Sequence, residues 1–72
     1  MEIVYISSND LAPDGATSFK LREKQGGFIF SLERNGLTFD SPPYPDQSLA
    51  LAAAIERARE LGIGKMYRIM PN

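Results

Sequence analysis

The fold of this chain is decided by residues 28–40, FIFSLERNGLTFD. Asn35-Gly36 is the pair that best accepts positive φ at both positions of a two-residue turn, and alternating apolar residues flank it on both sides. Such a turn makes Leu32 oppose Phe39 and sets the register of the whole hairpin. The apolar face of this hairpin, expected in the core, consists of Phe28, Phe30, Leu32, Leu37 and Phe39. The other face carries Ile29, Ser31, Glu33, Thr38 and Asp40.

Residues 19–24, FKLREK, alternate in the same way and predict a strand that pairs with the start of this hairpin. An even-numbered loop between the two strands, either Gly26-Gly27 alone or residues 24–27, puts Phe19 and Leu21 on the apolar face. An odd-numbered loop would turn both side chains away. We therefore expect the even loop, with Leu21 in the core.

Residues 46–62 predict one helix. Asp46 is its expected N-cap, and Gly62 stands where a left-handed C-terminal cap belongs. Small side chains recur at i, i+4 spacing and form a shallow ridge, which lets the helix axis lie close to a sheet rich in phenylalanine: Ala50, Ala54 and Ala58.

Residues 3–7 and 65–70 predict a strand near each end of the chain. The whole chain, 1–72, is then a single small α+β domain: an antiparallel β-meander with one α-helix packed on one face, in the order β-β-β-β-α-β. The last strand returns either to an edge of the sheet or beside the first strand, and the sequence leaves this open. Its apolar side chains lie on both sides of the strand. One side is expected to pack inward, and the other is either ordinarily buried, which we favour, or an exposed edge patch that pairs with a second copy.

Composition excludes several kinds of chemistry. The 72 residues include neither Cys nor His, so the usual zinc ligands and the usual proton shuttle at neutral pH are absent. Neither a phosphate-binding nor a dinucleotide-binding glycine motif is present. We expect a protein that is not an enzyme and has no catalytic residues, cofactor, metal site or small-molecule substrate. The start of the chain does not resemble a signal peptide, and a cytoplasmic protein without membrane association is expected.

Two groups of polar residues allow alternative interpretations. Asn9, Asp10 and Asp14 supply oxygen atoms that suit a hard cation, but acidic residues beside Pro13 and Gly15 are also ordinary turn formers, and we favour the turn. The second group is a basic stripe with Tyr5 or Tyr67 beside it, which indicates either a stacking surface for single-stranded nucleic acid or a solvated face with cross-strand charge pairs. The candidate interaction surface comprises Lys20, Arg22, Lys24, Ile29, Ser31, Tyr67 and Arg68.

Residues 27–32, the Asn35-Gly36 turn and the alanine-bearing helix that ends at Leu61-Gly62, together with Ser41 and Tyr44, resemble the small bacterial YegP-like domains of unknown function. The likeness covers roughly residues 19–70 and rests on structural motifs. It implies a fold and no activity. HicB-like antitoxin domains have a similar sheet-then-helix order, and that resemblance would imply a toxin as partner.

The sequence as a whole predicts a small protein-interaction module. It is expected to self-associate as a homodimer, or to bind an unidentified protein partner, through the sheet face or edge away from the helix. The alternative is a weak single-stranded nucleic-acid binder that uses Lys20, Arg22 and Lys24 on the second strand. A net charge of -1 makes nucleic acid the less expected partner.

Overall fold

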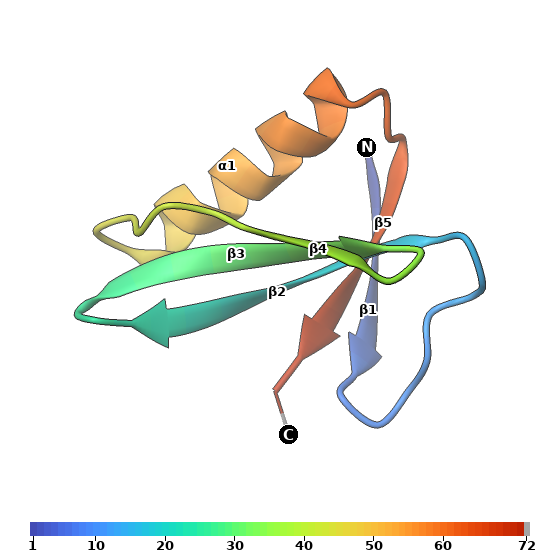
Figure 1. Cartoon of the computed structure of the whole chain (residues 1–72), viewed down its shortest axis with the longest axis horizontal. Helices are drawn as coiled ribbons and strands as arrows, with labels where there is room; N and C mark the ends of the chain where they lie inside the picture. Colours follow the sequence, from blue (N-terminus) through green and yellow to red (C-terminus); the bar gives the residue numbers. More distant parts are fainter. Residues whose placement is uncertain (72) are drawn as a thin grey trace.

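A computed structural model describes residues 1–71 as a five-stranded sheet with one helix on one face (Figure 1). The α+β class and the order β-β-β-β-α-β are confirmed. The elements are β1 (Glu2–Ser7), β2 (Thr17–Lys24), β3 (Gly27–Arg34), β4 (Leu37–Asp40), α1 (Gln47–Glu60) and β5 (Lys65–Met70).

Two tight hairpins build the antiparallel part of the sheet. Asn35 and Gly36 have φ values of 53° and 80°, and Leu32 opposes Phe39 as the turn predicts. Gln25 and Gly26, with φ values of 52° and 79°, form a second two-residue turn between β2 and β3. The even loop is therefore confirmed, although its residues are Gln25-Gly26. Leu21 opposes Phe30 and packs against the core.

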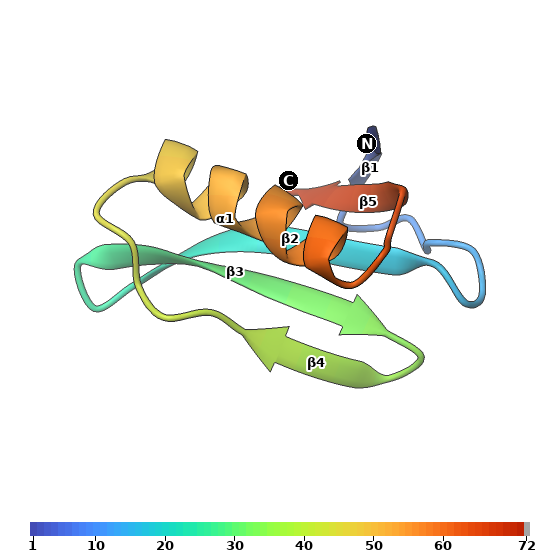
Figure 2. The same cartoon turned by 90° about the horizontal axis from the view of Figure 1, so that it is seen from above.

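The strand order is β1-β5-β2-β3-β4, so the expected antiparallel meander is confined to β2, β3 and β4, which form one side of a mixed sheet (Figure 2). β5 is parallel to both β1 and β2 and lies between them. The last strand therefore lies beside the first, and the alternative in which it offers an exposed edge is wrong. Because α1 carries the chain from the end of β4 back over β3 and β2, it delivers β5 next to β2. The open edges of the sheet are β1 and β4.

Both predicted caps of α1 are present. The Asp46 carboxylate accepts a hydrogen bond from the Leu49 N–H at 2.9 Å. At the other end Gly62 has φ 74°, and the Ile63 N–H donates to the Ala58 carbonyl at 2.9 Å, which closes the last turn. The predicted ridge is confirmed as well, because three alanines of α1 are fully buried against the sheet: Ala50, Ala54 and Ala58.

α1 covers only part of the apolar face. A helix is about 10 Å across and neighbouring strands are about 4.8 Å apart, so one helix covers about two strands. Here those strands are β2 and β3, and Phe30 is only 3% exposed. β4 lies beyond the helix, where Phe39 is 45% and Leu37 is 79% exposed. The expectation that these two side chains belong to the core is wrong, since β4 lies outside the two strands that α1 covers.

The different burial of two phenylalanines in one hairpin gives a stability prediction. Phe30→Ala should lower the free energy of unfolding by about 3–5 kcal/mol, because it leaves a cavity under α1. Phe39→Ala should lower it by about 1–2 kcal/mol, because much of that ring is already in water. Urea unfolding followed by circular dichroism measures both, with Phe30→Leu as the milder variant if Phe30→Ala does not fold. Equal losses at the two positions would contradict the burial described above.

Candidate protein-interaction surfaces

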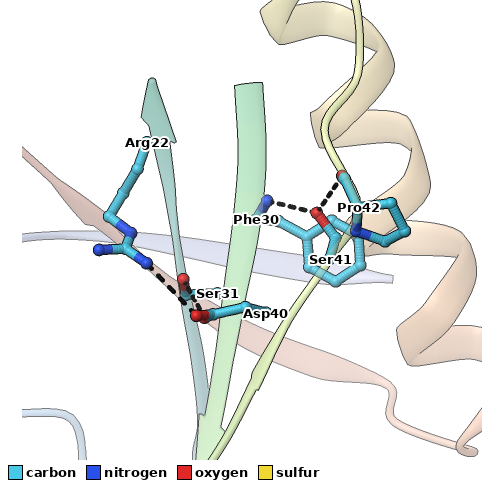
Figure 3. Close-up of polar contacts among 6 residues, drawn as sticks. All are labelled: Arg22, Phe30, Ser31, Asp40, Ser41 and Pro42. Atoms are coloured by element: carbon cyan, nitrogen blue, oxygen red, sulfur yellow. Dashed lines mark hydrogen bonds and ion pairs between the residues drawn. The ribbon is translucent and has the colours of Figure 1, made fainter. Parts of the chain in front are cut away.

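The basic side chains of β2 lie on the sheet face away from α1. Lys20, Arg22 and Lys24 are all exposed, as their alternation with the core residues of β2 requires. Arg22 is engaged within the protein: its Nη2 lies 3.4 Å from Asp40 Oδ2 on β4 (Figure 3). Ser31, on the strand between them, donates a hydrogen bond to Asp40 Oδ1 at 2.7 Å. A cross-strand charge pair therefore accounts for Arg22, and at this exposure it contributes about 0–1 kcal/mol.

Two members of the predicted interaction surface are not accessible. Ile29 is 2% exposed and Ser31 is buried, although both lie on the face away from α1. Ile29 opposes Arg22 on β2, and on its other side it lines a small cavity with Asp40 and Pro43. The Arg22–Asp40 pair and the segment after β4 thus close over these side chains, so they cannot contact a partner directly.

Tyr67 and Arg68 lie on opposite faces of β5. Tyr67 opposes Ser18 and so shares the face of the basic side chains, with Lys65 Nζ 5.4 Å from its ring centroid. Arg68 opposes Phe19 on the α1 face, and its Cζ lies 5.7 Å from the ring centroid of Tyr5. The prediction that Arg68 extends the stripe of Lys20, Arg22 and Lys24 is wrong, because alternation along β5 turns it away.

The polar loop between β1 and β2 forms turns of its own. Asp10 Oδ2 accepts hydrogen bonds from the Ser7 N–H and the Ser7 hydroxyl, both at 3.2 Å. The Ala16 N–H donates to the Pro13 carbonyl at 3.0 Å, across a turn that places Gly15 at φ 79°. These contacts support the interpretation of the acidic residues as turn formers. Within residues 1–71, no group of three or more Asp and Glu side chains is placed to hold a metal ion.

The edge strand β4 ends in a bulge centred on Ser41. The Ser41 N–H donates to the Phe30 carbonyl at 2.9 Å. The Ser41 hydroxyl oxygen accepts the Phe30 N–H, also at 2.9 Å (Figure 3). Pairing resumes at Tyr44, opposite Phe28, so three residues of one strand face two of the other. A Cβ at the neighbouring Gly27 would lie 3.0 Å from Pro43 Cβ, which explains the glycine at this close approach.

An apolar groove runs between β4 and the C-terminal end of α1. We call it the β4 groove; it has a volume of about 350 Å³ and its lining includes Leu37, Phe39, Arg57, Leu61 and Ile63. Leu61 is 54% exposed, and the Arg57 guanidinium carbon lies 5.5 Å from the ring centroid of Phe39. The groove thus joins exposed apolar side chains from a strand, a helix end and the following turn.

Sequence reasoning missed the β4 groove because it placed Leu37 and Phe39 in the core and gave Leu61 no role outside the helix. One signal was available: a single helix cannot cover more than about two strands of a wider sheet. The strand that lies farthest from the helix must then expose its apolar face.

Comparison of the chain with protein-family models, with curated proteins and with solved structures finds no match. The resemblance to YegP-like domains therefore stays a prediction. No helix among the described residues has the length and apolar character needed to cross a membrane.

The hydroxyl of Ser41 gives a prediction about the bulge that ends β4. Ser41→Ala should lower the free energy of unfolding by about 1–3 kcal/mol, because it leaves the Phe30 N–H buried without its acceptor. Ser48→Ala, on the exposed surface of α1, is the matched control and should change stability by no more than about 0.5 kcal/mol. Chemical denaturation of the two variants measures the difference. Indistinguishable stabilities would show that water replaces the lost hydroxyl.

Proposed function

We propose that this chain is a small protein-interaction module, which binds a protein partner through the β4 groove. The observation that carries the proposal is the convergence of three exposed apolar side chains in one groove: Leu37 is 79%, Leu61 is 54% and Phe39 is 45% exposed. Scattered exposed leucines are normal on a protein surface, but a contiguous apolar patch from separate elements is typical of a binding site.

The chemistry of the groove suits an apolar anchor side chain from a partner. Its volume of about 350 Å³ lies near the lower end of the roughly 300–1,000 Å³ of small-ligand pockets. Interface energy is concentrated in a few apolar or aromatic side chains that enter such pockets, with arginine enriched around them. Arg57, stacked on Phe39 at the wall of the groove, supplies that arginine, and it also forms an ion pair with Glu60 at 3.7 Å.

Binding without catalysis is part of this proposal, as is a cytoplasmic location. Three acidic side chains support the absence of catalysis, because each has a structural role. Asp40 pairs with Arg22, Asp46 caps α1 and Asp10 closes a turn. None of these three faces the β4 groove. Glu33 is the one acidic residue in the lining of the groove. The groove can therefore bind an apolar partner side chain but offers no pair of carboxyl groups for acid and base catalysis.

Exposed leucines at two places in the chain provide the test of this function. Leu37→Glu should abolish capture of the partner and leave the fold intact, because the side chain is already mostly in water and a charge in the groove opposes apolar binding. Leu11→Glu is the matched control, since Leu11 is 94% exposed in the loop between β1 and β2. Affinity capture from an extract of cells that make the protein, followed by mass spectrometry, compares both variants with the wild type.

The expected result is a protein retained by the wild type and by Leu11→Glu and lost with Leu37→Glu. The same set of captured proteins for all three chains would refute the groove as the binding site. Circular dichroism of each variant before capture checks that the fold is unchanged.

Single-stranded nucleic acid is the second candidate partner. It is favoured by the exposure of Lys20 and Lys24 on one face and by Tyr67 on the same side of the sheet. It ranks second because Arg22 is paired with Asp40 and because Tyr5 and Arg68 lie on the other face.

A salt titration of single-stranded RNA binding tests this second function. If the stripe binds the backbone, Lys20→Ala with Lys24→Ala should reduce the slope of log K against log salt by about 0.7 for each lost contact. Arg59→Ala, on the exposed surface of α1 and so on the other side of the sheet, is the control and should leave that slope unchanged. Failure of the wild type to bind RNA even at low salt would remove nucleic acid as a partner.

A further inference from the structure

β1 is the less protected of the two open edges of the sheet. It is six residues long, and residues 3–6, IVYI, contain neither a charge nor a proline. Natural edge strands usually carry lysine, proline or a bulge that prevents pairing with another chain. β4 has such protection: it is four residues long, and the Ser41 bulge and two prolines follow it. β1 has none between Glu2 and Ser7, so it is the edge suited to a further strand.

The direction of one hydrogen bond fixes which backbone groups β1 presents. The Glu2 N–H donates to the Gly64 carbonyl at 2.9 Å, toward β5. Because the N–H and C=O of successive residues point alternately to the two sides of a strand, Ile3, Tyr5 and Ser7 face the open edge. Ser7 is already engaged, since its N–H donates to Asp10 and its carbonyl accepts the Asp10 N–H at 3.0 Å. Ile3 and Tyr5 therefore remain as the outward hydrogen-bonding residues of β1.

We propose that β1 pairs antiparallel with β1 of a second copy of this chain, with Val4 at the two-fold axis. In this register Ile3 opposes Tyr5 of the other copy, and Tyr5 opposes Ile3. Both available residues on each edge then form hydrogen-bonded pairs with their counterparts. A shift that places Tyr5 opposite Tyr5 would bring Ile3 against Ser7, whose groups are already bonded to Asp10. The shift that places Ile3 opposite Ile3 leaves Tyr5 beyond the start of the opposing strand.

The side chains fit the same register. Ile3 and Tyr5 lie on the α1 face, where Ile3 packs against the core and Tyr5 is 60% exposed beneath the Arg68 guanidinium. An aromatic ring opposite a β-branched side chain is a favourable cross-strand pair. Val4 meets Val4 on the other face, at the closely spaced non-hydrogen-bonded position. Glu2 opposes Ile6, so no like charges face each other across the axis.

A second copy of the chain meets the requirements of this edge. The hydrogen-bonding groups are symmetric about Val4, which is the condition for an isologous contact between identical surfaces. Pairing in this register continues the sheet from one copy into the next and keeps both helices on the same face, because opposed residues of antiparallel strands share a face. The β1 edge is remote from the β4 groove, at the other end of the strand order, so this inference is independent of the proposed function (Figure 2).

The test uses proline at outward-facing positions of the two edges. Tyr5→Pro removes an outward N–H of β1 without removing a hydrogen bond to β5, and proline is tolerated on an edge strand in this orientation. Thr38→Pro is the matched control on β4. The Ser41 N–H points to β3, so alternation turns the Thr38 N–H to the open edge. Sedimentation equilibrium over a concentration series measures the weight-average mass of each chain.

The wild type and Thr38→Pro are expected to rise with concentration toward twice the monomer mass, while Tyr5→Pro stays monomeric. Amide hydrogen exchange of the wild type gives an independent measure, because the N–H groups of Ile3 and Tyr5 should become protected as concentration rises. A strictly monomeric wild type, or dimers of Tyr5→Pro that match the wild type, would overturn the inference. Loss of the dimer with Thr38→Pro alone would assign the contact to β4, and protection of Ile3 and Tyr5 only upon addition of cell extract would assign the edge to another protein.

Discussion

One helix must cover a sheet of five strands, and the surface of this protein follows from that mismatch. Three buried alanines bring α1 close to β2 and β3, where Phe19, Phe30 and Leu32 fill the space. The contact is efficient but narrow, because a helix about 10 Å wide spans about two strand spacings. Residues 1–71 contain no second helix that could widen the layer. The strands that α1 leaves uncovered therefore lie toward both ends of the sheet.

At one end the mismatch exposes side chains, and at the other it exposes backbone. β4 extends the apolar face past the helix, so Leu37 and Phe39 line a groove with Leu61. β1 is added outside β5, and its apolar residues form an edge that no element of residues 1–71 covers. On the sheet face away from α1 the centre is covered, because the Arg22–Asp40 pair and the segment after β4 close over Ile29. The uncovered apolar surface thus lies toward the ends of the sheet, and on the face with the basic stripe Arg22 is engaged within the protein.

The sequence predicts the parts of this structure that local rules govern. Asn35-Gly36 sets the turn, the register and the strand pairing, and Asp46 and Gly62 set the limits of α1. The place of β5 in the strand order depends on the path of the chain through α1, and no residue in or near β5 determines that path by itself. Arg68 was assigned to the wrong face because its orientation depends on the register between β5 and β2. Leu37 was assigned to the core because alternation reports the face of a sheet and not the width of the layer that covers it.

The separation of the two candidate surfaces has a consequence for binding. Pairing through β1 places the two copies of β4 at the far ends of one continuous sheet, and the β4 grooves then open on the same face as both helices. Neither groove is used in forming the dimer, since no residue of β1 lines it. A partner that carries two anchor side chains would bind such a dimer with the second contact made intramolecular, which raises the apparent affinity without any new contact when the spacing matches. Dimer formation through β1 would in this way raise the apparent affinity of the β4 grooves for such a partner, although each groove alone is shallow.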